Sequence, residues 1–161
     1  MSSADTSDPG ITDRRLSELG IKLPVPPTPF GAYVEAVQTG NLLFLTGMLA
    51  TEGHAAKVVG RLGKELDVAA GRDAATTAAL NALAVARQHL GSLDRVQRVV
   101  RLGVYIATAG DFYDQPKVAD AASELFLAVF GPEKNSSRLV LGVASLPLGV
   151  PIELEVILEV T

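Results

Sequence analysis

Near its end the chain reads RLVLGVA (138–144), SLPLG (145–149) and IELEVILEV (152–160). The apolar residues of the first and third segments predict two strands, 138–144 and 152–160, and the Leu-Pro-Leu-Gly segment predicts the turn that joins them. In the second strand the apolar side chains alternate with Glu153, Glu155 and Glu159, interrupted only by Ile157. Such alternation indicates a sheet with one buried face and one acidic face.

The rest of the chain supplies two helices and further strands. Asp67 is a suitable N-cap for an alanine-rich helix that ends at Gly91, and a second helix is expected over 115–130, before Gly131-Pro132. A strand is predicted over 96–107, a hairpin over 33–39 and 42–46, and a loop over 47–66 with a short strand at 58–59.

Two long helices and a sheet built partly from hairpins predict an α+β fold, with the helices on one face of the sheet. The other face should carry Arg101, Tyr105 and the glutamates together with Val99 and Ile157. That face is too apolar for open solvent and too polar for a dry core. We therefore expect it to form a subunit interface.

The N-terminal part divides into two segments before a domain at 30–161. Residues 1–10 are small and polar, which predicts a flexible tail. Residues 11–29 form an arm, with a short helix capped by Thr12 or Asp13 that stops at Gly20, followed by a proline-rich extended stretch.

Composition excludes several classes of function. The 161 residues contain no cysteine and two histidines, which excludes disulfides, thiolate zinc sites and a cysteine nucleophile. The net charge of −4, without a basic run, disfavours nucleic-acid partners. No apolar run approaches the roughly 18 residues of a membrane span, and the N-terminus resembles no signal peptide, so a cytoplasmic location is expected.

The histidines have unremarkable settings in the sequence. His89 lies near the end of a predicted helix, where a protonated ring interacts favourably with the helix dipole. His54 lies in the predicted loop and should be exposed.

The remaining chemistry lies in Arg138 and Glu153, each at the start of a predicted strand. One interpretation is a cross-strand salt bridge, worth about 0.2 to 1 kcal/mol. The other is a site in which the guanidinium binds a carboxylate in bidentate geometry and the glutamate acts on water beside it. The second arrangement would suit hydrolysis of a small carboxylated substrate.

A family resemblance favours the second interpretation. The segments RLVLGVASLP (138–147) and IELE (152–155), with GAYV (31–34) and GNLLFLTG (40–47), resemble the signature of the RidA family (YjgF, formerly L-PSP endoribonuclease). The resemblance covers about residues 28 to 160.

The resemblance implies a chorismate-mutase-like α+β fold and a homotrimer with a central barrel and sites between subunits. It also implies hydrolysis of reactive enamines and imines, such as 2-aminoacrylate and 2-iminobutanoate, to 2-keto acids and ammonia, with no cofactor or metal. Position by position, Arg138 matches the carboxylate-binding arginine, Glu153 the water-orienting glutamate, Gly47 a backbone contact and Tyr33 an aromatic wall.

Two substrate-binding positions depart from the family pattern. Val140 stands where many members have cysteine, and Asp120 where many have asparagine, which adds a negative charge near a site for an anion. A non-catalytic trimer that binds a small carboxylate therefore stays an alternative. An endoribonuclease, an activity also attributed to the family, is disfavoured by the acidic charge balance.

Overall fold

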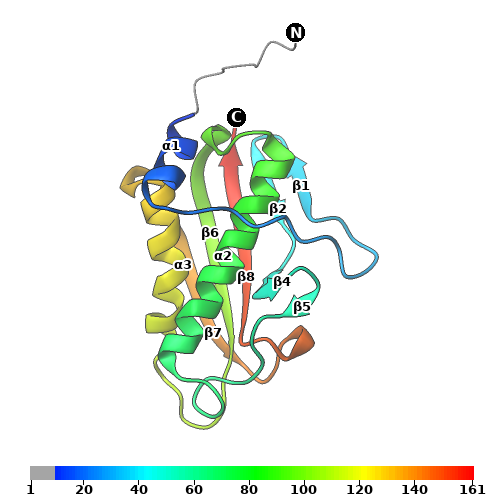
Figure 1. Ribbon diagram of the computed structural model, residues 1–161, viewed down its shortest axis with the longest axis vertical. Helices are drawn as coiled ribbons and strands as arrows, with labels where there is room; N and C mark the ends of the chain where they lie inside the picture. Colours follow the sequence, from blue (N-terminus) through cyan, green and yellow to red (C-terminus); the bar gives the residue numbers. More distant parts are fainter. Residues whose placement is uncertain (1–9) are drawn as a thin grey trace.

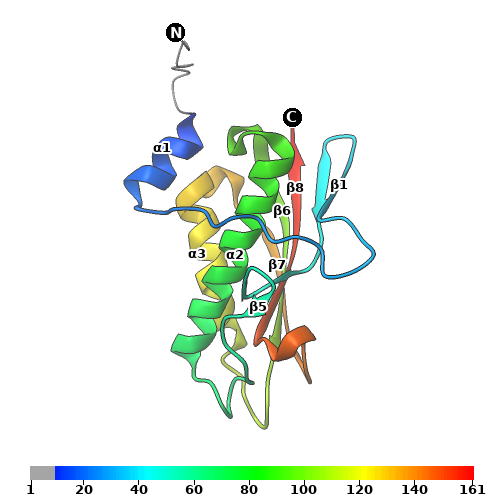
Figure 2. The ribbon, with the colours of Figure 1, turned by 45° about the vertical axis from the view of Figure 1, so that its right-hand side comes forward.

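The computed structural model describes residues 10–161, so nine of the ten residues of the predicted tail lie outside the described part. A six-stranded sheet carries two long helices, α2 (Val68–Leu90) and α3 (Gln115–Phe130), on one face (Figures 1 and 2). The sheet strands are β1 (Ala36–Thr39), β2 (Leu42–Leu45), β3 (Met48–Leu49), β6 (Val96–Ala107), β7 (Ser137–Val143) and β8 (Ile152–Val160). The predicted α+β fold is confirmed.

The order of the strands is β1-β2-β8-β6-β7, and β3 extends the pairing of β8. Only β6 and β7 are parallel; the other pairs are antiparallel. The expectation that a tight turn makes β7 and β8 neighbours is wrong, because β6 lies between them. The helix α3 connects β6 to β7 as a parallel crossover, and this leaves the other edge of β6 for β8.

Both long helices begin and end where the sequence indicates. The Asp67 side chain accepts a hydrogen bond from the Ala70 N–H at 2.9 Å, and Gly91 ends α2 with a φ of 80°. Pro116 lies in the first turn of α3, and Gly131 ends it with a φ of 87°. Most of the small alanines of α2 are buried, which lets this helix lie close to the sheet.

The alternation predicted for the last strand is confirmed. Its apolar residues are buried beneath the helices, and the residues between them lie on the open face. Val99 was expected on that open face and is instead 1% exposed. The pairing of β6 with β8 shifts between Val99 and Arg101, and such a bulge changes the face on which a side chain lies.

The arm is tied to the rest of the molecule. Neither Thr12 nor Asp13 caps α1 (Ile11–Glu18); Gly10 is its N-cap, and the Thr12 N–H donates to Asp94 Oδ1 at 2.8 Å. Leu16 and Leu23 belong to the buried core. The first turn of a helix can thus be satisfied by a distant carboxylate, which sequence spacing does not reveal.

The segment after β3 also differs from expectation. No strand forms at 58–59; a two-stranded hairpin forms instead from β4 (Thr51–Glu52) and β5 (Ala55–Ala56), with Gly53 in the turn at a φ of 60°. Single 3₁₀ turns lie at Leu93–Arg95, Pro132–Lys134 and Pro147–Gly149. Within residues 10–161, no helix is long and apolar enough to cross a membrane.

Candidate functional site

One cavity brings together three of the predicted site residues. Its volume is about 310 Å³, and it lies where the segment before β1, the start of β3, the Pro147 turn and β8 meet. Its lining consists of Phe30, Tyr33, Thr46, Gly47, Leu49, Pro147, Leu148 and Glu153. We call it the Glu153 cavity. Tyr33, Gly47 and Glu153, which lie far apart in the sequence, all border it.

The Glu153 carboxylate is the one ionisable group of this lining that lacks a partner. It is half-buried and has neither a hydrogen bond nor an ion pair within residues 10–161. Loss of hydration on burial raises its pKa above the ordinary value of a glutamate. A carboxylate in such a setting is a suitable general base.

Gly47 allows this carboxylate to lie against the backbone. A Cβ placed on Gly47 would be 2.0 Å from Glu153 Oε1, closer than any two such atoms can approach. Glu153 is the register partner of Leu49 on β3, which holds the two segments side by side. Glycine is therefore needed at position 47 for the observed position of the carboxylate.

Tyr33 forms an exposed wall of the cavity. The Phe30 N–H donates to the Tyr33 hydroxyl at 2.9 Å, which fixes the ring against the chain just before it. Phe30 in turn packs on the His54 ring, with centroids 4.5 Å apart. Phe30 and Tyr33 therefore both contribute rings to the cavity lining.

Arg138, Asp120 and Val140 lie together in a second region, at the β7 edge. Arg138 Nη1 donates to Asp120 Oδ1 on α3 at 2.7 Å and to Ser123 Oγ at 3.1 Å. Val140, two residues along the strand, packs against the core on the same side of the sheet. The negative charge predicted at position 120 thus pairs directly with the guanidinium.

A single chain does not bring Arg138 and Glu153 together. Arg138 pairs in register with Leu102, and its side chain points to the helix-covered side. Glu153 pairs with Tyr105 on the open face, and β6 separates the two strands. The interpretation as a cross-strand salt bridge is wrong, because the ionic partner of Arg138 is Asp120.

Several residues of these regions have no signal in the sequence. Phe30, Leu49 and Ser123 reach their places through tertiary packing alone. Leu148 has a φ of 59°, unusual for a residue other than glycine, and it lies beside Gly149 in the Pro147 turn. Such a conformation often marks a functional segment, although no sequence rule assigns it to this leucine.

The two histidines are engaged in contacts within the fold. His54 is exposed, as expected, and its Nε2 lies 2.6 Å from Thr28 Oγ1. His89 lies in the last turn of α2, and its Nε2 is 3.2 Å from Gln38 Oε1. Among the residues that the structure describes, no three His, Asp or Glu side chains gather as metal ligands would.

The sequence is similar to those of known proteins over most of its length. Residues 13–158 match the family described as "YjgF/chorismate_mutase-like, putative endoribonuclease". The chain is 39% identical to protein TCP17 of Trypanosoma cruzi over 151 residues, 93% of this chain and 94% of that protein. It is 29% identical to a 2-iminobutanoate/2-iminopropanoate deaminase of Dermatophagoides farinae over 140 residues, 87% of this chain and 94% of that protein.

A solved structure shows the same arrangement of elements. The crystal structure of Atu1372 from Agrobacterium tumefaciens, a protein of unknown function, superposes with a TM-score of 0.85 at 35% identity. The superposition covers 93% of this chain and 92% of that one.

Proposed function

The chain belongs to the YjgF/chorismate-mutase-like family, and from this we propose that it is a hydrolytic deaminase. Its substrates would be reactive 2-imino and enamine acids of the 2-aminoacrylate and 2-iminobutanoate type, and its products 2-keto acids and ammonia. A relative that carries the name of this activity, 29% identical to the chain, supports the proposal. The observation that carries it is the unpaired carboxylate of Glu153 in its cavity.

Glu153 has the properties that imine hydrolysis requires. In solution an enamine substrate tautomerises to the imine, which reacts in its protonated form. The Glu153 carboxylate takes a proton from water as the water oxygen bonds to the imine carbon and the C=N electron pair moves to nitrogen, giving a tetrahedral carbinolamine. Glu153 returns this proton to the amine nitrogen, the C–N bond breaks with release of ammonia, and the hydroxyl proton passes to solvent as the C=O bond forms. A carboxyl group of raised pKa serves both steps, because it holds its proton more firmly between them.

Arg138 supplies the group that would bind the substrate carboxylate, and a second copy of the chain would bring it to Glu153. The two residues lie on opposite sides of the sheet of one chain. We therefore propose a homotrimer in which Arg138 of one subunit faces the Glu153 cavity of the next. No cofactor or metal takes part in the proposed chemistry.

The open face of the sheet supports this assembly. Val37 on β1 and Phe44 on β2 are exposed and in register at one side of this face, and Leu139 and Leu141 of β7 are exposed at the other side. Between them β8 and β6 contribute Ile157 and the bonded group of Arg101, Tyr105 and Glu155. A sheet face with exposed apolar side chains at both sides supports coverage by a second chain.

A turnover assay tests the function. Freshly generated 2-aminoacrylate and longer 2-imino acids should lose ammonia faster with the protein than in buffer. Arg138→Ala should abolish both carboxylate binding and turnover, because charged hydrogen bonds contribute about 1.5 to 3 kcal/mol each. Glu153→Gln should retain binding and lower the rate about 100-fold or more. A wild-type rate equal to that in buffer would contradict the deaminase assignment.

One observation favours the alternative of a non-catalytic trimer that binds a small carboxylate. Asp120 Oδ1 lies 2.7 Å from Arg138 Nη1, so a substrate anion has to compete with this carboxylate for the guanidinium. In that case 2-keto acids should bind at Arg138 while imine hydrolysis stays at the buffer rate. Calorimetric titration beside the turnover assay separates the two functions.

A further inference from the structure

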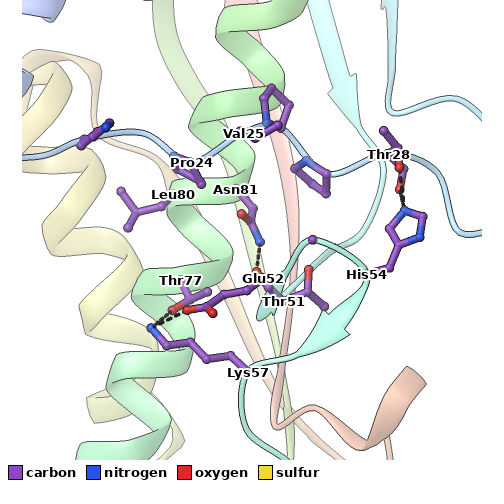
Figure 3. A pocket seen from close by; sticks show the side chains of 14 residues that line it. Pro24, Val25, Thr28, Thr51, Glu52, His54, Lys57, Thr77, Leu80 and Asn81 are labelled. Atoms are coloured by element: carbon purple, nitrogen blue, oxygen red, sulfur yellow. Dashed lines mark hydrogen bonds and ion pairs between the residues drawn. The ribbon is translucent and has the colours of Figure 1, made fainter.

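A second cavity of about 420 Å³ lies on the helix side of the molecule (Figure 3). Its walls are residues 22–28, the β4–β5 hairpin and one face of α2. Residues 22–28, which we call the strap, have no regular secondary structure and cross over α2 (Figures 1 and 2). No residue borders both this strap cavity and the Glu153 cavity.

The strap is held in place at both ends, so the cavity has defined walls. Leu23 is buried in the core at one end. At the other end His54 Nε2 lies 2.6 Å from Thr28 Oγ1 and 3.1 Å from the Thr28 carbonyl oxygen. Proline also fixes φ, which limits the motion of the chain between these points.

The inner surface of the cavity is mainly apolar. Pro24, Pro26 and Pro27 of the strap are partly buried and face a cavity that Leu80 of α2 also borders. Figure 3 shows Pro24 and Leu80 to one side of Asn81. A concave, largely apolar site of roughly 300 to 1,000 Å³ with few polar groups is typical of small-molecule binding.

The side-chain oxygen of Asn81 is a hydrogen-bond acceptor at the cavity. This residue is 3% exposed, and its Nδ2 donates to the carbonyl oxygens of Leu49 at 3.1 Å and Thr51 at 2.9 Å. Both N–H groups of the amide are therefore used, and the assignment of nitrogen and oxygen follows from the two acceptors. Within residues 10–161, Oδ1 has no hydrogen-bond partner and can only accept.

The Thr51 hydroxyl is not open to the cavity. Thr51 is 2% exposed and borders the cavity, but its Oγ1 is fully buried and has no hydrogen-bond partner within residues 10–161. An occupant of the cavity therefore does not reach this hydroxyl, and Asn81 Oδ1 is the acceptor that the floor offers.

The charged groups at the rim do not require an ionic occupant. Lys57 Nζ lies 3.3 Å from Thr77 Oγ1 and 3.7 Å from Glu52 Oε1, so the two charges offset each other. Lys22 is exposed at the other side of the rim. The side chains that α2 contributes to the lining, those of Thr77, Leu80 and Asn81, are neutral.

From these contacts we propose that the strap cavity binds a small neutral molecule that carries an N–H donor, such as a primary amide. Its apolar body lies between the proline rings and Leu80. Its N–H donates to Asn81 Oδ1. This binding site does not depend on the deaminase activity proposed above.

Three probes of similar shape test the chemistry: benzamide, acetophenone and benzoate. Acetophenone retains the ring and carbonyl but lacks the N–H, and benzoate replaces the amide with an anion. With ¹⁵N-labelled protein, benzamide should shift the Asn81 side-chain amide and the backbone amides of Thr51 and Gly53, with a Kd on the order of 10 mM. Acetophenone and benzoate should bind there at least fivefold more weakly. Equal shifts with acetophenone, or no shifts with benzamide, would overturn the proposal.

A variant that fills the cavity tests the location. Leu80→Phe should weaken benzamide binding at least fivefold, while Leu127→Phe, at an exposed leucine of α3, should leave it within twofold. Thr77→Met fills the same cavity from a half-buried position and serves if the first variant unfolds in a thermal scan. Unchanged benzamide binding in the folded variants would place the probe elsewhere and refute the inference.

Discussion

Replacing Gly47 by alanine should separate the proposed catalysis from folding in this protein. The added Cβ would lie 2.0 Å from Glu153 Oε1 and 3.0 Å from Cδ. Non-bonded heavy atoms need roughly 3.5 Å, so the carboxylate must move by about 1.5 Å. A misplacement of about 1 Å can lower a rate about 100-fold, and we expect a loss of that order in imine hydrolysis.

The same substitution should leave the fold intact. The atom that the Cβ meets is the free end of a flexible side chain, which can rotate away. Gly47 does not have a positive φ, so alanine fits its backbone, and a less flexible unfolded chain contributes up to about 1 kcal/mol of stability. The melting temperature should therefore stay close to that of the wild type.

The assay compares turnover of 2-aminoacrylate with thermal unfolding for two variants. Gly31→Ala is the matched control, because a Cβ at that position would meet only Tyr33, at an ordinary 3.6 Å. It should retain turnover within about twofold. A Gly47→Ala variant that keeps the wild-type rate would show that the position of the Glu153 carboxylate does not matter, and the reasoning would fail.

Three further outcomes are expected. Because burial raises the pKa of Glu153, the folded chain holds the carboxyl proton more tightly than the unfolded chain, and ionisation of Glu153 destabilises the fold. Glu153→Gln should therefore raise the melting temperature at pH 7. The difference between variant and wild type should vanish as the pH falls through the raised pKa of Glu153. A lower melting temperature at pH 7 would indicate a stabilising partner. Asp120→Asn should strengthen the binding of 2-keto acids, measured by calorimetry, about threefold to fivefold, because a partly exposed ion pair contributes at most about 1 kcal/mol. Unchanged affinity would mean that Asp120 does not compete with the ligand for Arg138. Phe44→Lys should dissociate the proposed trimer, and light scattering should detect the smaller species. Leu127→Lys, at an exposed position of α3, should leave the assembly unchanged. If the Phe44→Lys variant is still a trimer, the interface lies elsewhere.

The elements of the fold could be predicted because their signals are local. The Asp67 cap, Gly91 and Gly131 mark helix ends through contacts and dihedral angles within a few residues. The alternation of β8 shows which side chains are buried, because successive residues of a strand face opposite sides. Local patterns do not reveal the bulge in β6, and for this reason the buried position of Val99 could not be predicted.

The candidate site could be predicted only in part. The family resemblance implies site roles for Tyr33, Gly47 and Glu153, and the structure brings all three to one cavity. The motifs could not show that Arg138 lies on the other side of the sheet with Asp120, because that depends on which strand enters between β7 and β8.

The sequence by itself determined the two long helices, the strands of the main sheet other than β3, the buried face of β8 and the residue types available for chemistry. The tertiary structure alone decided the strand order, the pairing of Arg138 with Asp120 on α3, and the cavity that the strap forms over Asn81. The physical reason is the range of the interactions. Caps, turns and alternation depend on neighbours in the chain, whereas strand order and cavities depend on a balance among packing arrangements of distant segments, which no local pattern records.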